Sequence, residues 1–433
     1  MEEEHKLVLY KEYKTFLVIS VVFIAAAFVF NRPGEIIAGL GRIFVSPGIL
    51  RTEYMVIGGI GAAIINSTLV GVYSVLLLYC SRTKPTGGMI MALWMAVGWT
   101  YWGANVLTII PLTCGVWLYS RVKKRTFSDF MVIAILGETI APIVGVFMFS
   151  NPIMLQLGAE WPMAITILFG VAMGLICGFL MPIIAGAASN MHQGYTLYNM
   201  GVTGGFIATF LAGILRIFGI NVPTETMWFT ESRLQIAIFL YVVWAALLLA
   251  GLILGGSKKI NHFENMKKIM AHPGKAPNDF YQLGGETAYI NMALLGILTT
   301  TITLVLGAGF NGGTFACIFS VVAFGSFGKH LKNVVPILAG SILCAYLNMY
   351  EMSAPQNILP ILWASCLAPI CGTYGWFWGI VTGFLHVVIL NHVGTVTNGF
   401  NLYNNGFTSG FVAFFLPPII AAISKEKAKP EKA

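Results

Sequence analysis

Asparagine, threonine and tyrosine side chains stand inside two apolar stretches of the chain, in nearly the same order. The stretches read Tyr198-Asn199-Met200-Gly201-Val202-Thr203 and Tyr403-Asn404-Asn405-Gly406-Phe407-Thr408. Amides and hydroxyls both donate and accept hydrogen bonds, and glycine lets a chain leave helical geometry. In lipid, a broken helix is tolerated only where it is buried in protein or lines a watery cavity. We therefore predict that these two Tyr-Asn elements, residues 198–203 and 403–408, bind a polar substrate, mainly through Tyr198, Asn199, Thr203, Tyr403, Asn404, Asn405 and Thr408.

Ionisable residues within apolar runs are few, so each one is informative. Glu138 either couples transport to protons or holds a cation such as Na⁺, or it is a carboxyl that stays protonated or pairs with a neighbouring helix. Lys329 and His330 lie with Lys332 in the turn of a glycine-containing hairpin. They either bind an anion or snorkel to the cytoplasmic surface. For His386, near the end of an apolar run, a surface position is expected.

Composition indicates that lipid is the main solvent of this chain. Of its 433 residues, 57% are hydrophobic and 10% are charged, against about 45–50% and about 25% in soluble domains. Several runs are long enough to cross about 30 Å of hydrocarbon. The formal net charge of +8 is explained by basic cytoplasmic loops, so we expect the lipid bilayer and no nucleic acid as a partner.

The chain contains its membrane domain twice. Besides the Tyr-Asn elements, matched residues recur at one constant offset: Asn66 with Asn291, Gly88 with Gly313, and Pro111 with Pro336. Glycine, proline and asparagine in a fixed order rarely match by chance in a membrane protein. We predict a first repeat over residues 1–220, a second over residues 221–433, and a cytoplasmic linker at 256–285.

Loop charges predict that the second repeat is inverted. The loop after the first hairpin carries Arg121, Lys123, Lys124 and Arg125, whereas the matching loop has no lysine or arginine. Because basic loops stay in the cytoplasm, the two loops face opposite sides. When the chain is oriented so that all its basic loops lie in the cytoplasm, both termini are also expected in the cytoplasm. We expect the protein in the cytoplasmic membrane.

Two hairpins, at residues 88–120 and 313–347, are too short for two full spans each. We expect half-length or re-entrant helices, which point to a binding site in an inverted-repeat transporter. Free N–H groups at their glycine-rich starts, near Gly88 and Gly313, suit an anion or a carbonyl oxygen. Glycine there also permits close helix packing, and asparagine bonds between helices. The predicted fold is an all-α polytopic bundle with two inverted repeats and broken or re-entrant hairpins.

Asn66, Asn311-Gly312-Gly313, the Gly328-Lys329-His330 run and the two Tyr-Asn elements together resemble an uncharacterised bacterial membrane family, catalogued as a domain of unknown function. The resemblance covers nearly the whole chain and implies no particular substrate. More distantly, the duplicated element beside a glycine-rich hairpin is similar to the urea-transporter class of inverted-repeat channels. The chain lacks the Asn-Pro step usual in that class, so urea is not implied.

Membrane transport of a small polar solute or ion is the predicted function, with Asn66 and Asn291 added to the substrate site. We expect secondary transport coupled to protons or ions through Glu138, Lys329 or His330; the alternative is a passive channel. A membrane-embedded enzyme would need clustered catalytic carboxylates or histidines, which the sequence does not have, and a scaffold or sensor would leave the broken helices unexplained. No Walker loop, dinucleotide fingerprint or HExxH motif occurs, so we expect no enzymatic activity, cofactor or metal. The sequence leaves open a homo-oligomer.

Overall fold

The computed structural model of the chain describes residues 7–49, 52–158, 161–220, 222, 227–349, 351–393 and 396–423. Across these ranges every regular element is helical, and the β-type pairing is an isolated bridge between Glu53 and Trp102. The predicted all-α class is therefore confirmed. The predicted repeat boundary at residue 221, both chain termini, and the side chains of Asn391 and His392 lie outside the described part.

Nine of the described segments are long and apolar enough to cross a membrane. They contain 19 to 30 residues, and about 20 residues at about 1.5 Å each match about 30 Å of hydrocarbon. The chain is therefore a multi-pass membrane protein. The nine segments are α1 (Lys11–Phe30), α4 (Ile60–Cys80), Phe127–Phe149, α10 (Met163–His192), α11 (Asn199–Ile217), α12 (Arg233–Ser257), α15 (Thr287–Val305), Pro355–Tyr374 and α21 (Asn404–Ile423).

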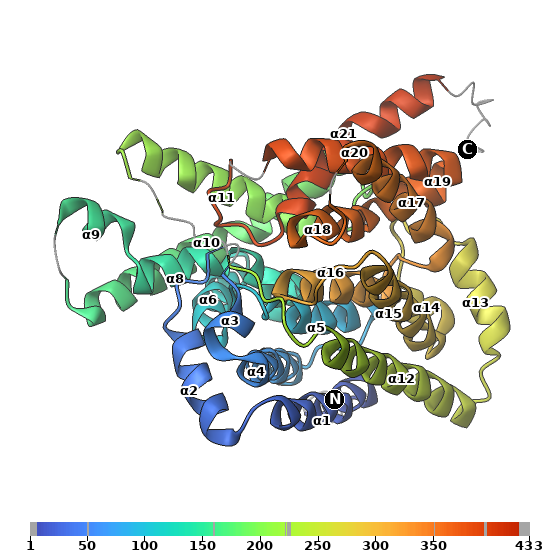
Figure 1. The fold of residues 1–433 in the computed structure, drawn as a ribbon, viewed down its shortest axis with the longest axis horizontal. Helices are drawn as coiled ribbons and strands as arrows, with labels where there is room; N and C mark the ends of the chain where they lie inside the picture. The colour runs from blue at the N-terminus through green and yellow to red at the C-terminus, as the bar shows by residue number, and fades with distance from the viewer. Residues whose placement is uncertain are drawn as a thin grey trace.

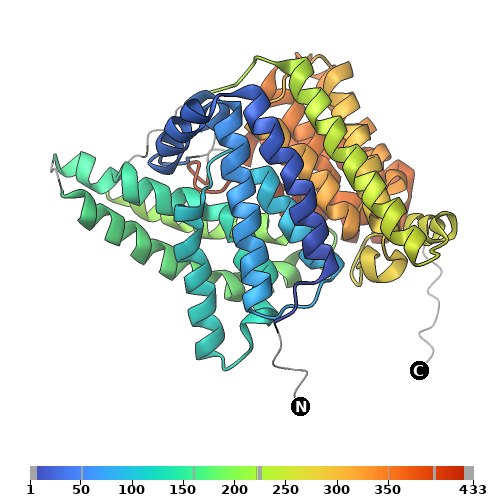
Figure 2. The ribbon, with the colours of Figure 1, turned by 90° about the horizontal axis from the view of Figure 1, so that it is seen from below.

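Two short helices, α5 (Gly87–Trp99) and α16 (Gly312–Ala323), lie side by side in the middle of the molecule (Figure 1). Helices α1, α4 and α12 run next to one another along one face of this centre (Figure 2). On the other side of the centre, α17 (Leu331–Leu347) and α20 (Trp376–Val393) pack together. Helix α6 (Val106–Val122) packs on α10, which extends outward with α11 on the left of Figure 1.

The outer helices have one face toward protein and one toward lipid. Helix α1 buries Phe16 and Phe23 in the core, whereas Val18 and Val29 on the same helix are 68% and 82% exposed. An exposed apolar stripe of this kind is unfavourable in water and is expected next to acyl chains. The exposed faces therefore agree with a membrane environment.

The first limbs of the two hairpins are too short to cross a bilayer. Helices α5 and α16 have 13 and 12 residues, which is about 18–20 Å at the usual rise. Every residue of α16 is buried, and so is every residue of α5 except Met89, which is half-buried. The second limbs, α6 and α17, have 17 residues each and contain Pro111 and Pro336. We predicted half-length or re-entrant helices for the hairpins as a whole; half-length helices are present in the first limbs, and the second limbs are longer.

Two spans are interrupted at the residues that the sequence singled out. Phe127–Phe149 contains the 3₁₀ segment η3 (Leu136–Ile140), and Pro355–Tyr374 contains η5 (Ala364–Leu367). Proline has no N–H, so Pro142 and Pro369 cannot donate to the carbonyls of Glu138 and Ser365, four residues earlier. Pro142 and Pro369 are matched residues, because Ala141-Pro142-Ile143 recurs as Ala368-Pro369-Ile370. They break both spans, and the breaks carry Glu138 and Ser365.

Contacts between the two halves of the chain occur at matched residues. The Trp94 ring of α5 stacks on the Phe319 ring of α16 with centroids 6.1 Å apart and an interplanar angle of 18°. In α11 and α21, a Cβ placed on Gly201 would lie 2.7 Å from the Gly406 Cα. These close contacts join positions of the two halves of the chain that match in the sequence. Shorter helices complete the fold: α2 (Pro33–Phe44), α3 (Tyr54–Gly58), η2 (Phe127–Phe130), α7 (Met131–Ile135), α8 (Ala141–Phe149), α9 (Pro152–Leu157), α13 (His262–Ala271), α14 (Phe280–Gly284), η4 (Phe324–Ser326), α18 (Pro355–Trp363) and α19 (Ala368–Tyr374).

Candidate functional site

The two Tyr-Asn elements form the starts of α11 and α21, each after a sharp turn. Gln193 and Asn398 have φ of 50° and 49°, and the glycines after them, Gly194 and Gly399, both have φ of 77°. The helix break is therefore several residues before the position that we expected. Gly201 lies inside a regular helix, and with Gly406 it allows close contact between the two helices.

The polar side chains of the Tyr-Asn elements mostly hold their own segments in place. Asn199 bonds to His192 Nε2 at 3.0 Å and donates to the Ala185 carbonyl at 3.1 Å. Thr397, the match of His192, donates to Asn404 Oδ1 at 2.9 Å. The Thr203 and Thr408 hydroxyls donate to the carbonyls of Asn199 and Asn404 within their own helices. Asn405 is bonded to His386 Nε2 at 3.2 Å.

Asn66 and Asn291 anchor the turns of the two hairpins by the same pair of hydrogen bonds. Asn66 Nδ2 donates to the carbonyls of Thr100 and Ala104 at 2.7 and 3.0 Å. Asn291 Nδ2 donates to those of Gly325 and Lys329, both at 2.7 Å. Carbonyls at a helix end need such partners when no water is present. The Oδ1 atoms of both asparagines are buried and have no hydrogen-bond partner among the described residues.

The glycine-rich starts of α5 and α16 are not free, which corrects our expectation. The Gly312 N–H donates to the Glu53 carboxylate at 3.1 and 2.9 Å. In the other direction, the Gly87 N–H donates to both Asp279 oxygens at 2.9 Å. Each carboxylate also caps the short helix that follows it, α3 or α14. The helix starts near Gly88 and Gly313 are therefore each capped by an acidic side chain from the other half of the chain.

Lys329 is completely buried, which excludes the alternative that it snorkels to the surface. Its Nζ donates to the Tyr198 hydroxyl at 2.8 Å and to Ser365 Oγ at 3.0 Å. It also lies 4.5 Å from the centroid of the Tyr198 ring and 5.3 Å from that of Phe324. Lys329 thus joins the tip of the second hairpin to the break in Pro355–Tyr374 and to the first Tyr-Asn element.

His330, next to Lys329, has a structural role in this arrangement. It caps α17 by accepting from the Asn333 N–H, and its Nε2 bonds to the His272 carbonyl at 2.9 Å. The matched residue Asn105 caps α6 in the same way. His386 is also fully buried, which corrects the surface position expected for it.

Glu138 is the residue of the first half of the chain that matches Ser365. It is fully buried and accepts a hydrogen bond from the Tyr403 hydroxyl. Its second oxygen, Oε2, has no hydrogen-bond partner in the described part of the chain. Beside it, the Thr139 hydroxyl donates to Asn401 Oδ1 at 2.8 Å, and the Leu402 N–H donates to the Thr139 carbonyl.

The structure brings four of the predicted residues together in two composite sites. The other predicted residues have the separate contacts described above. The lysine site contains Tyr198 and Lys329 with Ser365, and the glutamate site contains Tyr403 and Glu138. In both, the tyrosine comes from one repeat and packs on an aromatic ring of the other, Phe324 or Trp99, with centroids 5.1 or 3.8 Å apart. The two sites also have matching backbone hydrogen bonds. The Leu197 N–H donates to the Cys366 carbonyl, and the Leu402 N–H donates to the Thr139 carbonyl.

Aromatic rings lie beside the glutamate site. Trp99 stacks on Trp363 with centroids 5.0 Å apart, and its Nε1 donates to Ser320 Oγ at 2.9 Å. The Nε1 of Trp363 has no partner among the described residues. The site thus combines a large apolar surface with a few polar groups, which is usual for a small-molecule site.

The matching protein family is described as "Protein of unknown function (DUF1576)", and the match covers residues 32–217 and 258–422. The chain belongs to the DUF1576 family. The predicted membership of a family of unknown function is thereby confirmed. No curated protein and no solved structure matches the chain. The bacterial origin and the likeness to urea transporters stay predictions. The two DUF1576 segments leave out residues 1–31 and 218–257, which contain α1 and α12.

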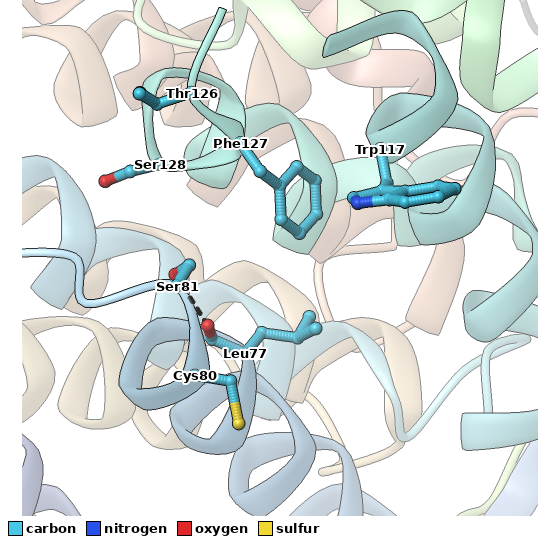
Figure 3. Close-up of a pocket in the computed structure, with 7 residues that line it drawn as sticks. All are labelled: Leu77, Cys80, Ser81, Trp117, Thr126, Phe127 and Ser128. Carbon is cyan, nitrogen blue, oxygen red and sulfur yellow. Dashed lines mark hydrogen bonds between the residues drawn. The ribbon is translucent and has the colours of Figure 1, made fainter. Parts of the chain in front are cut away.

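A pocket of about 300 Å³ lies elsewhere in this DUF1576 chain, at the ends of α4 and α6 (Figure 3). The Trp117 and Phe127 rings lie beside it, and the Ser81 hydroxyl donates to the Leu77 carbonyl at 2.6 Å. Its lining contains none of the predicted site residues: Leu77, Cys80, Ser81, Trp117, Thr126, Phe127 and Ser128. This pocket is therefore separate from the two composite sites.

Sequence reasoning missed Glu53, Asp279, Asn401 and Trp99. Glu53 and Asp279 each precede an aromatic residue and stand five residues before a Gly-Gly pair, Gly58-Gly59 or Gly284-Gly285. Extending the repeat alignment by these residues would have matched the two carboxylates. Asn401 carried no such signal, because its match is Thr196.

Proposed function

We propose that this DUF1576 chain is a secondary transporter for a small polar solute or ion, coupled to protons or ions. Its site lies between two inverted repeats in the cytoplasmic membrane, with both termini in the cytoplasm. It acts as a transporter and not as an enzyme, and it needs no cofactor. The observation that carries the proposal is the pair of composite sites, each buried, built from both repeats, and holding one ionisable side chain.

The reciprocal contacts support two repeats related by a twofold axis. In such a relation, residue i contacts residue j and the match of i contacts the match of j. The chain follows this rule at the Glu53 and Asp279 caps and at the tyrosines of both composite sites. The unequal charges of the matched loops support an axis in the membrane plane, which inverts one repeat.

Interrupted helices support a pathway through the composite sites. The breaks at Glu138 and Ser365 and the turns before α11 and α21 meet there, together with the hairpin tips. In known transporter architectures, such breaks lie at the substrate site near the middle of the bilayer. To open the pathway to one side of the membrane, the helix start that carries Tyr198 or Tyr403 would have to move away from the repeat that this tyrosine contacts.

Glu138 is the residue best suited to couple transport to protons. It is buried beside the Tyr403 hydroxyl and forms no ion pair among the described residues. A carboxyl of this kind is neutral while it is enclosed and can release its proton when water reaches it. Alternating hydration from the two sides would then move one proton per cycle.

The test is flux into proteoliposomes that contain a pH-sensitive dye, with small solutes offered one at a time, with and without a proton gradient. We expect one solute class to drive dye acidification in the wild type, and Glu138→Gln to abolish that signal. The exposed control Glu35→Gln should retain it. A solute flux that is the same with and without the proton gradient, and the same in Glu138→Gln as in the wild type, would contradict coupling and support a passive channel.

A further inference from the structure

Lys329 is the buried ionisable group that proton coupling through Glu138 does not use. Its side chain is fully buried, yet no ion pair among the described residues includes it. An ammonium group is costly to bury unless an opposite charge and hydrogen bonds replace its water. We infer that the transported solute is a small monovalent anion whose negative group binds at Lys329 and Tyr198. This inference rests on the proposed function and names the substrate of the same site.

The ammonium group of Lys329 has one hydrogen-bond donor that is not used by any described residue of the protein. An ammonium group has three donors, and two of them are used by Tyr198 Oη and Ser365 Oγ. The Ser365 hydroxyl donates to the Leu362 carbonyl at 2.8 Å, so it positions the lysine and has no proton left for a ligand. In the described part of the chain, the third donor of Lys329 has no acceptor.

Among the described residues, no carboxylate forms an ion pair with Lys329 in place of an anion. The titratable groups that face it are the Tyr198 hydroxyl and the thiols of Cys317 and Cys366. The Tyr198 and Phe324 rings lie beside the ammonium group and stabilise it only in part. A single lysine is a compact point charge, whereas divalent oxyanions are usually held by several donors or by arginine. The site therefore fits one negative charge on a small solute.

Comparison of the two composite sites supports the same assignment. In the sequence, Ala104 matches Lys329 and Glu138 matches Ser365. The lysine site therefore has a basic residue where the first half of the chain has alanine, and a serine where the glutamate site has its carboxyl. The positive and the acidic group are thus kept in separate sites, where they do not neutralise each other. An anion bound at one site and a proton bound at the other cross the membrane together without moving net charge.

The experiment measures binding, so that it does not depend on flux. Thermal unfolding of the purified full chain in detergent is followed while sodium acetate or its neutral isostere acetamide is added, at ionic strength held constant with sodium sulfate. A parallel series uses sodium chloride, which separates carboxylate recognition from general recognition of a monovalent anion. The variants are Lys329→Ala, which introduces the residue of the matched position, and Lys332→Ala, which changes an exposed lysine on the next turn.

We expect acetate, but not acetamide, to raise the unfolding midpoint of the wild type in a saturable way. Lys329→Ala should weaken the apparent affinity by at least about tenfold, the factor for loss of a charge-assisted contact, and Lys332→Ala should not. Without acetate, Lys329→Ala should unfold at the same or a higher temperature, because it removes an unpaired buried charge. A lysine that only holds Tyr198 and Ser365 together would instead make this variant less stable. If it does not fold, Tyr198→Phe serves in its place and should weaken acetate binding.

An acetate effect that is absent from the wild type, or equal in Lys329→Ala, would overturn the anion site. Proton-coupled flux of a neutral solute that survives Lys329→Ala would overturn it too, while leaving the proposed function intact. Anion binding that depends on Lys329, together with no flux of any solute, would support the site and contradict the proposed function. The two failures are therefore distinguishable.

Discussion

Glu286 holds three helices together just outside the membrane-spanning segments. Its side chain is 1% exposed and accepts hydrogen bonds from Lys11 and Lys258, the latter at 2.7 Å. These residues lie at the start of α1 and just after α12, while Glu286 itself precedes α15. Burial on its own would raise the pKa of Glu286, but the bonds from the two lysines outweigh it and lower the pKa below its ordinary value.

Because the folded pKa of Glu286 is lowered, its contribution to stability is present above the unfolded pKa, about 4.3, and is lost as the pH falls through the folded value. We expect Glu286→Gln to lower the free energy of unfolding at pH 7 by about 1–2 kcal/mol, between an exposed and a fully buried ion pair. The difference from the wild type should shrink below about pH 4.

Thermal unfolding in detergent between pH 3 and pH 8 measures both effects. The control is Glu264→Gln, because Glu264 pairs with Lys267 on the surface, with both side chains more than half exposed. That variant should differ little from the wild type at any pH. A constant difference between Glu286→Gln and the wild type across the whole range would contradict a charge-dependent role.

At the scale of single residues, the sequence identified the important residues more reliably than it identified the contacts of those residues. Lys329 and Glu138 were identified because charge is rare in apolar runs, but burial decides between snorkelling and binding, and burial depends on distant segments. Glu53 and Asp279 were missed for the same reason. In the sequence, a carboxyl group beside a loop looks like an ordinary surface charge. Only the folded chain shows that it caps a distant helix, which for Asp279 lies more than 190 residues away in the sequence.

At the scale of elements, the close crossing of α11 and α21 depends on two matched glycines. A Cβ on Gly201 would lie 2.7 Å from the Gly406 Cα and 2.8 Å from the Tyr403 carbonyl oxygen. These are backbone atoms, so a side chain there forces the helices apart. The Asn401 amide, which donates to the Gly201 carbonyl at 3.1 Å, would move as well.

We therefore expect Gly201→Ala to lower the free energy of unfolding by about 1–3 kcal/mol, as overpacking usually does. It should also weaken solute-driven acidification, because α11 and α21 begin with the tyrosines of the composite sites. Gly213→Ala, on the same helix with no atom within 4 Å of the added Cβ, should be neutral or slightly stabilising. Equal effects of the two substitutions would show that the crossing is unimportant.

Element order was predictable because hydropathy and helix breakers are local properties. Among the described residues, each half of the chain has, in the same order, one leading helix, one long helix, a hairpin and three further helical segments. The position of the break near each Tyr-Asn element was not predictable, since both Gly194 and Gly201 permit it. Only packing shows that Gly194 adopts the positive φ and that Gly201 faces another helix.

At the scale of the whole molecule, the proposed inversion makes a prediction about two turns. Lys124 and Met349 occupy matched positions after α6 and α17, and both have φ of 54°. With one repeat inverted, a cysteine at Lys124 should react with a membrane-impermeant maleimide only in permeabilised cells, and one at Met349 also in intact cells.

The background for this labelling needs two substitutions, Cys80→Ser and Cys114→Ser, because the other five cysteines are buried. Solubilised protein should be labelled at both introduced positions, which shows that each cysteine is reactive. Labelling of Lys124→Cys and Met349→Cys from the same side of the membrane would contradict inverted repeats.

Each half of the chain caps the central helix of the other half, through Glu53 on α16 and Asp279 on α5. This has a consequence for how such a chain could arise. A gene for one half alone would encode a polypeptide whose short central helix, α5 or α16, begins without the carboxyl that caps it. With the repeats inverted as proposed, only a partner polypeptide inserted the other way up would complete both helices. Fusion of the two genes makes that partnership permanent and frees each half to mutate separately. A lysine on one side and a glutamate on the other then become compatible within a single protein.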